Sequence, residues 1–211
     1  MNAFSLQSRP WRRATLLAAA MLVCASGARA EAIVGADADI GANAANGTLG
    51  AVTVNEAAGL DNAQSNQLTI TSGVSGMGAA LNGTSSEQSA SVKARVANAS
   101  ASIGQGAFAN ASGAVLVNQT AGVGNTQSNS AQIGTGFIGV QTVSDIDLSR
   151  AAAANGGRGQ SGGSGGIREA SISSTAFRNA TGLVQLNQTA GAGNATANSF
   201  VLRPPAGTLF N

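Results

Sequence analysis

Hydrophobic and polar side chains alternate along short segments of this chain, and glycine and asparagine separate the segments. Residues 52–54 (VTV) and 184–186 (VQL) alternate with a period of two, as in a β-strand that buries one face. Gly124-Asn125 is a turn signal, because both residue types tolerate a positive φ. Polar segments of strand character follow at about 64–70 and 127–133. We therefore expect two or three short strands per unit, folded into one flat layer.

The same pattern occurs three times. Residues 50–68, 113–131 and 182–200 align without a gap, and seven of the 19 columns are identical in all three. The identical columns are Gly50/Gly113/Gly182, Val52/Val115/Val184, Asn55/Asn118/Asn187, Ala58/Ala121/Ala190, Gly59/Gly122/Gly191, Asn62/Asn125/Asn194 and Asn66/Asn129/Asn198. Such a repeat indicates units that cannot bury a core alone and stack on their neighbours.

The repeats and the segments between them predict the domain organisation. Residues 155–166 (NGGRGQSGGSGG) are typical of a flexible Gly/Ser-rich linker. The expected order is signal peptide 1–30, repeat 1 at 31–70, linker 71–100, repeat 2 at 101–133, linker 134–169, repeat 3 at 170–202 and a C-terminal tail 203–211.

Stacking in register would place equal columns about 4.8 Å apart, where amide side chains can hydrogen-bond along the stack. The second and third blocks contain no charged residue, and the first contains Glu56 and Asp61, so few like charges would be stacked on one another. The predicted fold is all-β, a repeat-built β-solenoid or cross-β stack. The expected self-assembly core comprises Val52, Asn55, Asn62, Gln64, Asn66, Val115, Asn118, Gln119, Asn125, Gln127, Asn129, Val184, Asn187, Gln188, Asn194 and Asn198.

The first 30 residues have the features of a secretory signal peptide. Arg12 and Arg13 lie before a short apolar run, residues 16–23, and Ala28-Arg29-Ala30 is a cleavage pattern. The run is shorter than the roughly 20 residues that span a bilayer, so we expect no stable membrane insertion. Cleavage after Ala30 leaves seven cations and nine anions, a net charge of −2. This balance argues against a nucleic-acid partner, which would need a cationic face.

Composition also argues against an enzyme. The chain has no His, and its one Cys, Cys24, lies in the expected signal peptide. General acid–base and nucleophilic catalysis therefore lack their usual groups. The acidic pairs Asp37/Asp39 and Asp145/Asp147 lack the glycine-spaced loop of calcium sites. The sequence predicts no catalytic residue, no cofactor and no metal site.

A stack without capping segments would pair its outer layers with other copies of the chain, so self-assembly is the expected activity. The pattern Val-Asn-[Glu/Gln]-x-Ala-Gly-x-x-Asn-x-[Gln/Thr]-x-Asn, in three copies behind a signal peptide, resembles the Fap functional amyloids of Gram-negative bacteria. The resemblance covers the repeats and the overall plan. It implies fibril-core roles for Asn55, Gln64, Asn66, Asn118, Gln119, Gln127, Asn129, Asn187, Gln188 and Asn198.

The resemblance also implies secretion through the periplasm and an outer-membrane export pore, to a place in the biofilm matrix at the cell surface. Expected partners are other copies of the chain and related fibril subunits. Subunits of the family usually end in a closely spaced cysteine pair, which this chain lacks. The roles of major subunit, nucleator and minor component therefore stay open.

Two other functions fit the same sequence. The repeats could form a closed, monomeric β-solenoid of a surface adhesin. They could also form an assembly factor that binds a related fibril subunit. The first protein stays monomeric and binds a surface ligand, and the second slows or redirects another subunit. The Asn and Gln columns, taken alone, could mark only solvated turns.

Overall fold

The chain forms a stack of three layers, each made of three strands. The computed structural model describes residues 32–72, 88, 90, 94–135 and 166–202, which all belong to one unit, Ala32–Asn211. The expected signal peptide, most of both expected linkers and the expected C-terminal tail lie outside the described residues. We name the layers by their strands: layer 1 is residues 32–72, layer 2 is residues 94–135 and layer 3 is residues 168–202.

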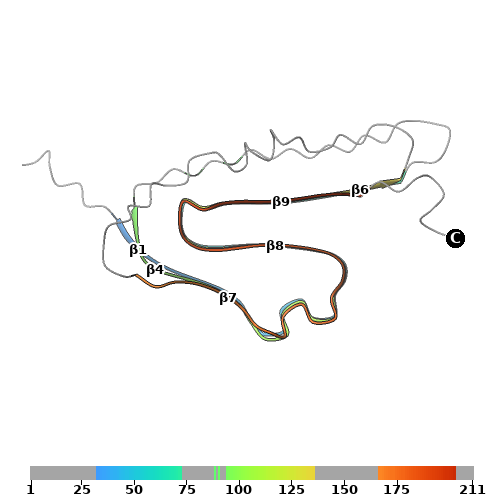
Figure 1. Cartoon of the computed structure of the whole chain (residues 1–211), viewed down its shortest axis with the longest axis horizontal. Coiled ribbons are helices and arrows are strands. Elements are labelled where there is room, and N and C mark those ends of the chain that lie inside the picture. Colours follow the sequence, from blue (N-terminus) through green and yellow to red (C-terminus); the bar gives the residue numbers. More distant parts are fainter. Residues whose placement is uncertain (1–31, 73–87, 89, 91–93, 136–165, 203–211) are drawn as a thin grey trace, which may run out of the picture. The chain divides into compact units, whose positions relative to one another are not determined.

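Each layer follows the same course. Layer 1 contains β1 (Ala32–Ile40), β2 (Leu49–Leu60) and β3 (Ala63–Ser72), and layer 2 contains β4 (Ala94–Ile103), β5 (Ser112–Val123) and β6 (Thr126–Thr135). Layer 3 contains β7 (Arg168–Ile172), β8 (Thr181–Ala192) and β9 (Ala195–Leu202). Viewed down the stack, the three layers follow one winding path and lie over one another (Figure 1).

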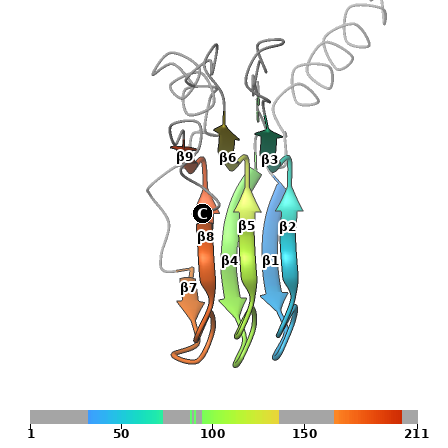
Figure 2. The ribbon, with the colours of Figure 1, turned by 90° about the vertical axis from the view of Figure 1, so that its right-hand side faces the viewer.

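Equal strands of successive layers pair in parallel, which makes three sheets with the orders β1-β4-β7, β2-β5-β8 and β3-β6-β9. The side view shows β2, β5 and β8 next to one another in sequence order (Figure 2). The central sheet pairs without a register shift, so Asn55 lies beside Asn118 and Asn118 beside Asn187. The predicted all-β stack of repeats is thus confirmed, and the repeats lie in register.

Two kinds of tight bend shape each layer. The first is the six-residue turn after β1, β4 and β7, and the second is the two-residue bend between the last two strands. Asp61, Gly124 and Gly193 share one column at the second bend and all have φ between 50° and 68°. The turn predicted at Gly124-Asn125 is where the chain reverses.

In layers 2 and 3 the first strand begins earlier than the repeat boundary expected from the sequence. β4 starts at Ala94 and β7 at Arg168, whereas the sequence places the second and third repeats from residues 101 and 170. The segment 94–100 (ARVANAS) carries small and polar side chains and therefore resembles a linker in composition. It is a strand because β1 and β7 pair with it, not because of its own hydrophobic pattern.

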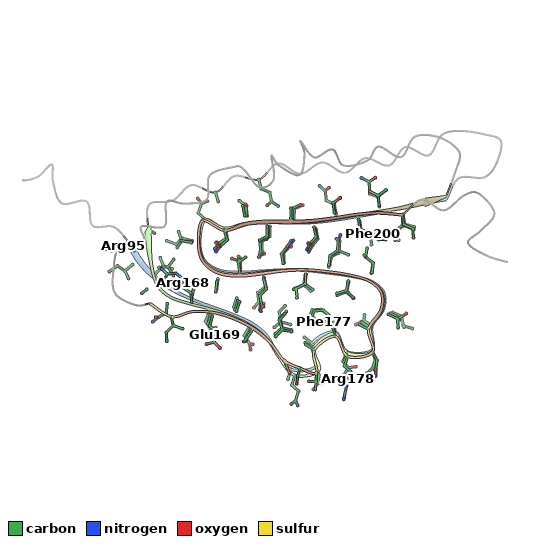
Figure 3. The ribbon with its side chains drawn as sticks, in the orientation of Figure 1. Arg95, Arg168, Glu169, Phe177, Arg178 and Phe200 are labelled. Atoms are coloured by element: carbon green, nitrogen blue, oxygen red, sulfur yellow. The ribbon has the colours of Figure 1, made fainter. Side chains whose placement is uncertain are left out.

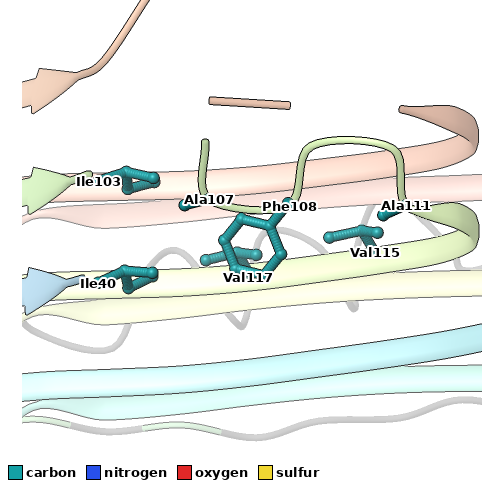
Figure 4. Close-up of a cluster of buried hydrophobic side chains, with 7 residues drawn as sticks. All are labelled: Ile40, Ile103, Ala107, Phe108, Ala111, Val115 and Val117. Atoms are coloured by element: carbon teal, nitrogen blue, oxygen red, sulfur yellow. The ribbon is translucent and has the colours of Figure 1, made fainter. Parts of the chain in front are cut away.

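Small clusters of apolar side chains lie between the sheets. The largest joins Ile40 and Ile103 to Phe108, Val115 and Val117, with Ala107 and Ala111 beside them (Figure 4). The rings of Phe108 and Phe177 stack with centroids 4.9 Å apart and planes 12° apart. The buried members of a second cluster are all alanines, including Ala101 and Ala121, and a third cluster joins Ala114, Leu116 and Ala131. The apolar core is therefore divided into narrow strips, and polar contacts fill the rest of the interior.

Candidate self-assembly site

Asparagine side chains form continuous columns through the stack. Asn118 Nδ2 donates to Asn55 Oδ1 at 3.0 Å, and Asn187 Nδ2 donates to Asn118 Oδ1 at 3.0 Å. These side chains point from the central sheet toward the third sheet. This follows from the period of two along β5, which sends Val117 toward the β4 side and Asn118 toward the β6 side.

A second asparagine column faces the first one across the same interior. Asn129 Nδ2 donates to Asn66 Oδ1, and Asn198 Nδ2 donates to Asn129 Oδ1, both at 2.9 Å. Within layer 2, Asn129 Nδ2 also donates to Asn118 Oδ1 at 3.0 Å and to the Val117 carbonyl at 3.0 Å. The two columns thus form one network that links layers to each other and strands within each layer. Because Asn118 and Asn129 are fully buried, this network replaces apolar packing at the centre of the stack.

The third asparagine column holds the bend between the last two strands. Asn125 Nδ2 donates to Asn62 Oδ1 and Asn194 Nδ2 donates to Asn125 Oδ1, both at 2.9 Å. The backbone N–H groups of Asn125 and Asn194 donate to the same oxygens at 3.0 Å. The bend is therefore repeated in the same place in every layer.

Glutamine side chains extend these contacts to the other strands. Gln119 Nε2 donates to the carbonyl of Ser102 at 2.7 Å and to Glu56 Oε2 at 2.9 Å, and Gln188 Nε2 donates to Gln119 Oε1 at 2.8 Å. Gln64 Nε2 donates to Gln127 Oε1 at 2.7 Å. The Gln119 side chain thus links β5 to β4, and the Gln127 side chain links β6 to β5 by donating to the Gln119 carbonyl.

The structure brings together nearly all the side chains singled out from the sequence. Asn55, Asn62, Gln64, Asn66, Asn118, Gln119, Asn125, Gln127, Asn129, Asn187, Gln188, Asn194 and Asn198 make side-chain hydrogen bonds between layers. Val52, Val115 and Val184 share a column on the opposite face of the central sheet. Val115 is 1% exposed and packs against Phe108, whereas Val184 in layer 3 is 40% exposed.

Sequence reasoning missed the role of the invariant glycines. A Cβ atom on Gly122 would lie 1.7 Å from the Gly191 carbonyl oxygen, and one on Gly113 would lie 2.1 Å from the Gly50 carbonyl oxygen. Both glycines lie inside strands and have φ near 130°. Their invariance within a strand pattern is the signal that indicates close backbone approach. The contact of Thr120 Oγ1 with Thr189 Oγ1, at 2.8 Å, was likewise not expected.

The described residues lack two other kinds of feature. None of them forms a helix long and apolar enough to cross a membrane. In the same part of the chain, no group of three or more acidic, histidine or cysteine side chains is placed to hold a metal ion. Gln119, Gln127 and Asn129 are buried polar groups, and each of them donates its amide protons to an oxygen within layer 2 and to another in a neighbouring layer.

Comparison with known proteins gives the family. No solved structure matches the chain. The model of the functional amyloid protein FapB/FapC family matches residues 21–205, which include all nine of the described strands. Proteins of this family are secreted extracellular fibril subunits with a structural role. The chain, whose three repeats stack through buried amide columns, therefore belongs to the functional amyloid protein FapB/FapC family.

Proposed function

We propose that this chain polymerises by stacking its layers on those of other copies, and that the fibril contributes to biofilm matrix and surface adhesion. The observation that carries the proposal is the state of the outer layers. β2 and β8 each pair with β5 on one side, and no described strand pairs with their other side. Unpaired strand edges of this kind are templates for another chain.

The outer layers also expose apolar side chains that layer 2 buries. Val184 is 40% exposed and Ile172 is 47% exposed, whereas their column partners in layer 2, Val115 and Ile103, are 1% and 2% exposed. One more layer from another copy would cover these surfaces in the same way. The free energy gained is about 25 cal/mol for each Å² of apolar surface removed from water. The described outer strands carry no capping segment of the kind that keeps solenoids monomeric.

The route to this fibril follows the order of segments in the sequence. A signal peptide would direct the chain to the periplasm, and an outer-membrane pore would release it, with related fibril subunits as further partners. A monomeric surface adhesin is the second candidate function. The parallel β-solenoid supports it, because such stacks also serve as stalks and binding surfaces.

Assembly from the purified chain tests the proposal. Residues 31–211 contain every described strand, and they would be diluted from denaturant and followed by thioflavin fluorescence and fibre diffraction. We expect fibres that seed further growth and give reflections near 4.7 and 10 Å. A soluble, β-rich monomer that gives no fibres would contradict the proposal and favour the adhesin.

A further inference from the structure

The amide columns have a direction. In all three asparagine columns the Nδ2 group of the later layer donates to the Oδ1 atom of the earlier layer, as from Asn118 to Asn55 and from Asn187 to Asn118. The Gln119 column runs the same way, whereas the Gln64–Gln127 bond runs the other way. The asparagine columns of layer 1 therefore present amide donors on its open side, and those of layer 3 present amide oxygens on its open side.

The glycine columns are also directional. A Cβ on Gly182 would lie 2.1 Å from the Gly113 carbonyl oxygen, and a Cβ on Gly113 would lie 2.1 Å from the Gly50 oxygen. A Cβ on Gly50 would have nothing within 4 Å, although Gly50 also has a positive φ, as its column partners do. The space beside Gly50 is therefore open to one more carbonyl group, which Gly182 of another copy would supply.

The two end layers also differ in net charge. The charged residues of layer 1 are Asp37, Asp39, Glu56 and Asp61, all acidic. Layer 3 carries Arg168, Glu169 and Arg178, a net charge of +1, with Glu169 and Arg178 pointing away from the fold (Figure 3). Two layer 1 faces would bring eight carboxylates together, whereas a layer 3 face brings a small opposite charge. Glu169 would then share a column with Asp37, on the exposed flank where water and salt screen the repulsion.

We propose that copies join in one direction, with layer 3 of one copy on layer 1 of the next, and that Glu56 makes this junction weaker than the junctions inside a copy. The inference rests on the proposed polymerisation and specifies its interface. The winding path of a layer has no mirror symmetry, so a layer turned over cannot superpose its columns (Figure 1). In the proposed direction Asn55 Nδ2 would meet the oxygens of Asn187, Asn198 and Ala197, as Asn118 meets those of Asn55, Asn66 and Ser65.

Glu56 interrupts this repetition. At the same position in layer 3, Gln188 Nε2 donates to three oxygens: the Gln119 side chain at 2.8 Å, the Ala101 carbonyl at 3.1 Å and the Ser171 carbonyl at 2.9 Å. Around Glu56 the corresponding oxygens would be the side-chain oxygen of Gln188 and the backbone carbonyl of Ala170, both from the neighbouring copy, and the backbone carbonyl of Asp39 in the same layer. An ionised carboxylate has no proton to donate to any of them. The junction between copies therefore lacks the hydrogen bonds that the Gln119 column makes inside a copy, and acceptors face one another instead.

Cross-linking tests the direction. Leu49 and Thr181 share a column with Ser112 and are both exposed, so Leu49→Cys and Thr181→Cys place thiols on the flank of the two end layers. Residues 31–211 contain no other cysteine. Fibres of either variant alone should give no covalent dimer on oxidation, whereas mixed fibres should give dimers and nothing longer. The double variant Leu49→Cys/Ser112→Cys, with adjacent thiols in one copy, shows whether the column geometry permits a disulfide.

A dimer from either variant alone would overturn the direction, and so would mixed fibres without dimers when the double variant does oxidise. Absence of fibres from the unchanged chain would instead overturn the proposed polymerisation. The two failures are therefore distinguishable.

The weakness at Glu56 is tested by the critical concentration for fibre growth at neutral pH. Glu56→Gln should lower the critical concentration by about tenfold or more, because a hydrogen bond to a buried acceptor strengthens the junction by at least about a factor of ten. Asp39→Asn removes the same charge from layer 1 and faces Ser171 in its column, so it should change the critical concentration by less than about twofold. Equal effects of the two variants, or a higher critical concentration for Glu56→Gln, would overturn the role of Glu56.

Discussion

Layer 2 and the two outer layers have closely similar sequences and differ in what covers them. Asn55, Asn118 and Asn187 occupy one column, yet Asn118 is fully buried, Asn187 is 6% exposed and Asn55 is exposed. Along β5 every residue from Ala114 to Val123 is buried, whereas burial along β8 alternates with half-exposed positions. In the asparagine column the residue type is the same in all three layers, so burial here depends on which sides of the side chain another layer covers. The outer layers are therefore unfinished copies of layer 2, and this difference is the physical reason to expect polymerisation.

The largest difference in stability between the layers is expected for a substitution that an outer layer can accommodate and the middle layer cannot. Gly122 and Gly191 share a column and have φ of 130° and 132°. Gly122→Ala places a methyl group 1.7 Å from a backbone oxygen, whereas Gly191→Ala meets the flexible Arg168 side chain at 3.2 Å. We expect Gly122→Ala to lower the free energy of unfolding by about 4 kcal/mol or more. Gly191→Ala should cost about 1–2 kcal/mol, for the positive φ alone.

Urea denaturation of the monomer, held below its critical concentration, measures both values by circular dichroism. Because the two variants share the same backbone strain, their difference isolates the steric contact between layers. Equal destabilisation would mean that the layers are not in the close register described here.

A second pair of variants compares the loss of an amide in the middle layer with the loss of its column partner in the first layer. Asn118 Nδ2 donates to Asn55 Oδ1, Asn66 Oδ1 and the Ser65 carbonyl, and its Oδ1 accepts from Asn129 and Asn187. Asn118→Ala leaves several of these partners buried without a hydrogen bond, so we expect a loss of about 2–4 kcal/mol. Asn55→Ala removes acceptors at an exposed edge and should cost about 1 kcal/mol or less. The same urea titration measures both, and a smaller loss for Asn118→Ala than for Asn55→Ala would contradict the network.

These residues also show how far the sequence could predict the structure. The columns were predictable because equal residues recur at equal positions, and parallel pairing in register is the arrangement that brings every equal pair together. Stacked amides at Asn118 and Asn129 follow from this arrangement. Their mutual hydrogen bond was not predicted, because it depends on how far β6 folds back over β5.

Two parts of the fold gave no readable signal in the sequence. The strands β4 and β7 begin in segments of polar, small and charged residues, and their pairing comes from layers that are distant in the sequence. The side chain of Gln119 reaches the carbonyl of Ser102 on the neighbouring sheet, a contact that depends on the six-residue turn after β4. Neither feature follows from local periodicity, because each is fixed by tertiary packing.

The smallest predicted change in stability comes from a substitution that makes the first layer more like the second. Ala45, Phe108 and Phe177 occupy equal positions in the three turns, with φ of 52°, 56° and 57°, so the backbone at Ala45 already has the conformation in which phenylalanine is found twice. Ala45 packs against the cluster that contains Phe108. Ala45→Phe should extend the stack of rings by one and raise the free energy of unfolding by about 0.5–1.5 kcal/mol. Ala45→Leu is the matched control, because it adds apolar volume without a ring and should gain less. The urea midpoints of the two variants give the difference, and a loss of stability for Ala45→Phe would mean that the first turn does not lie under the second as closely as the second lies under the third.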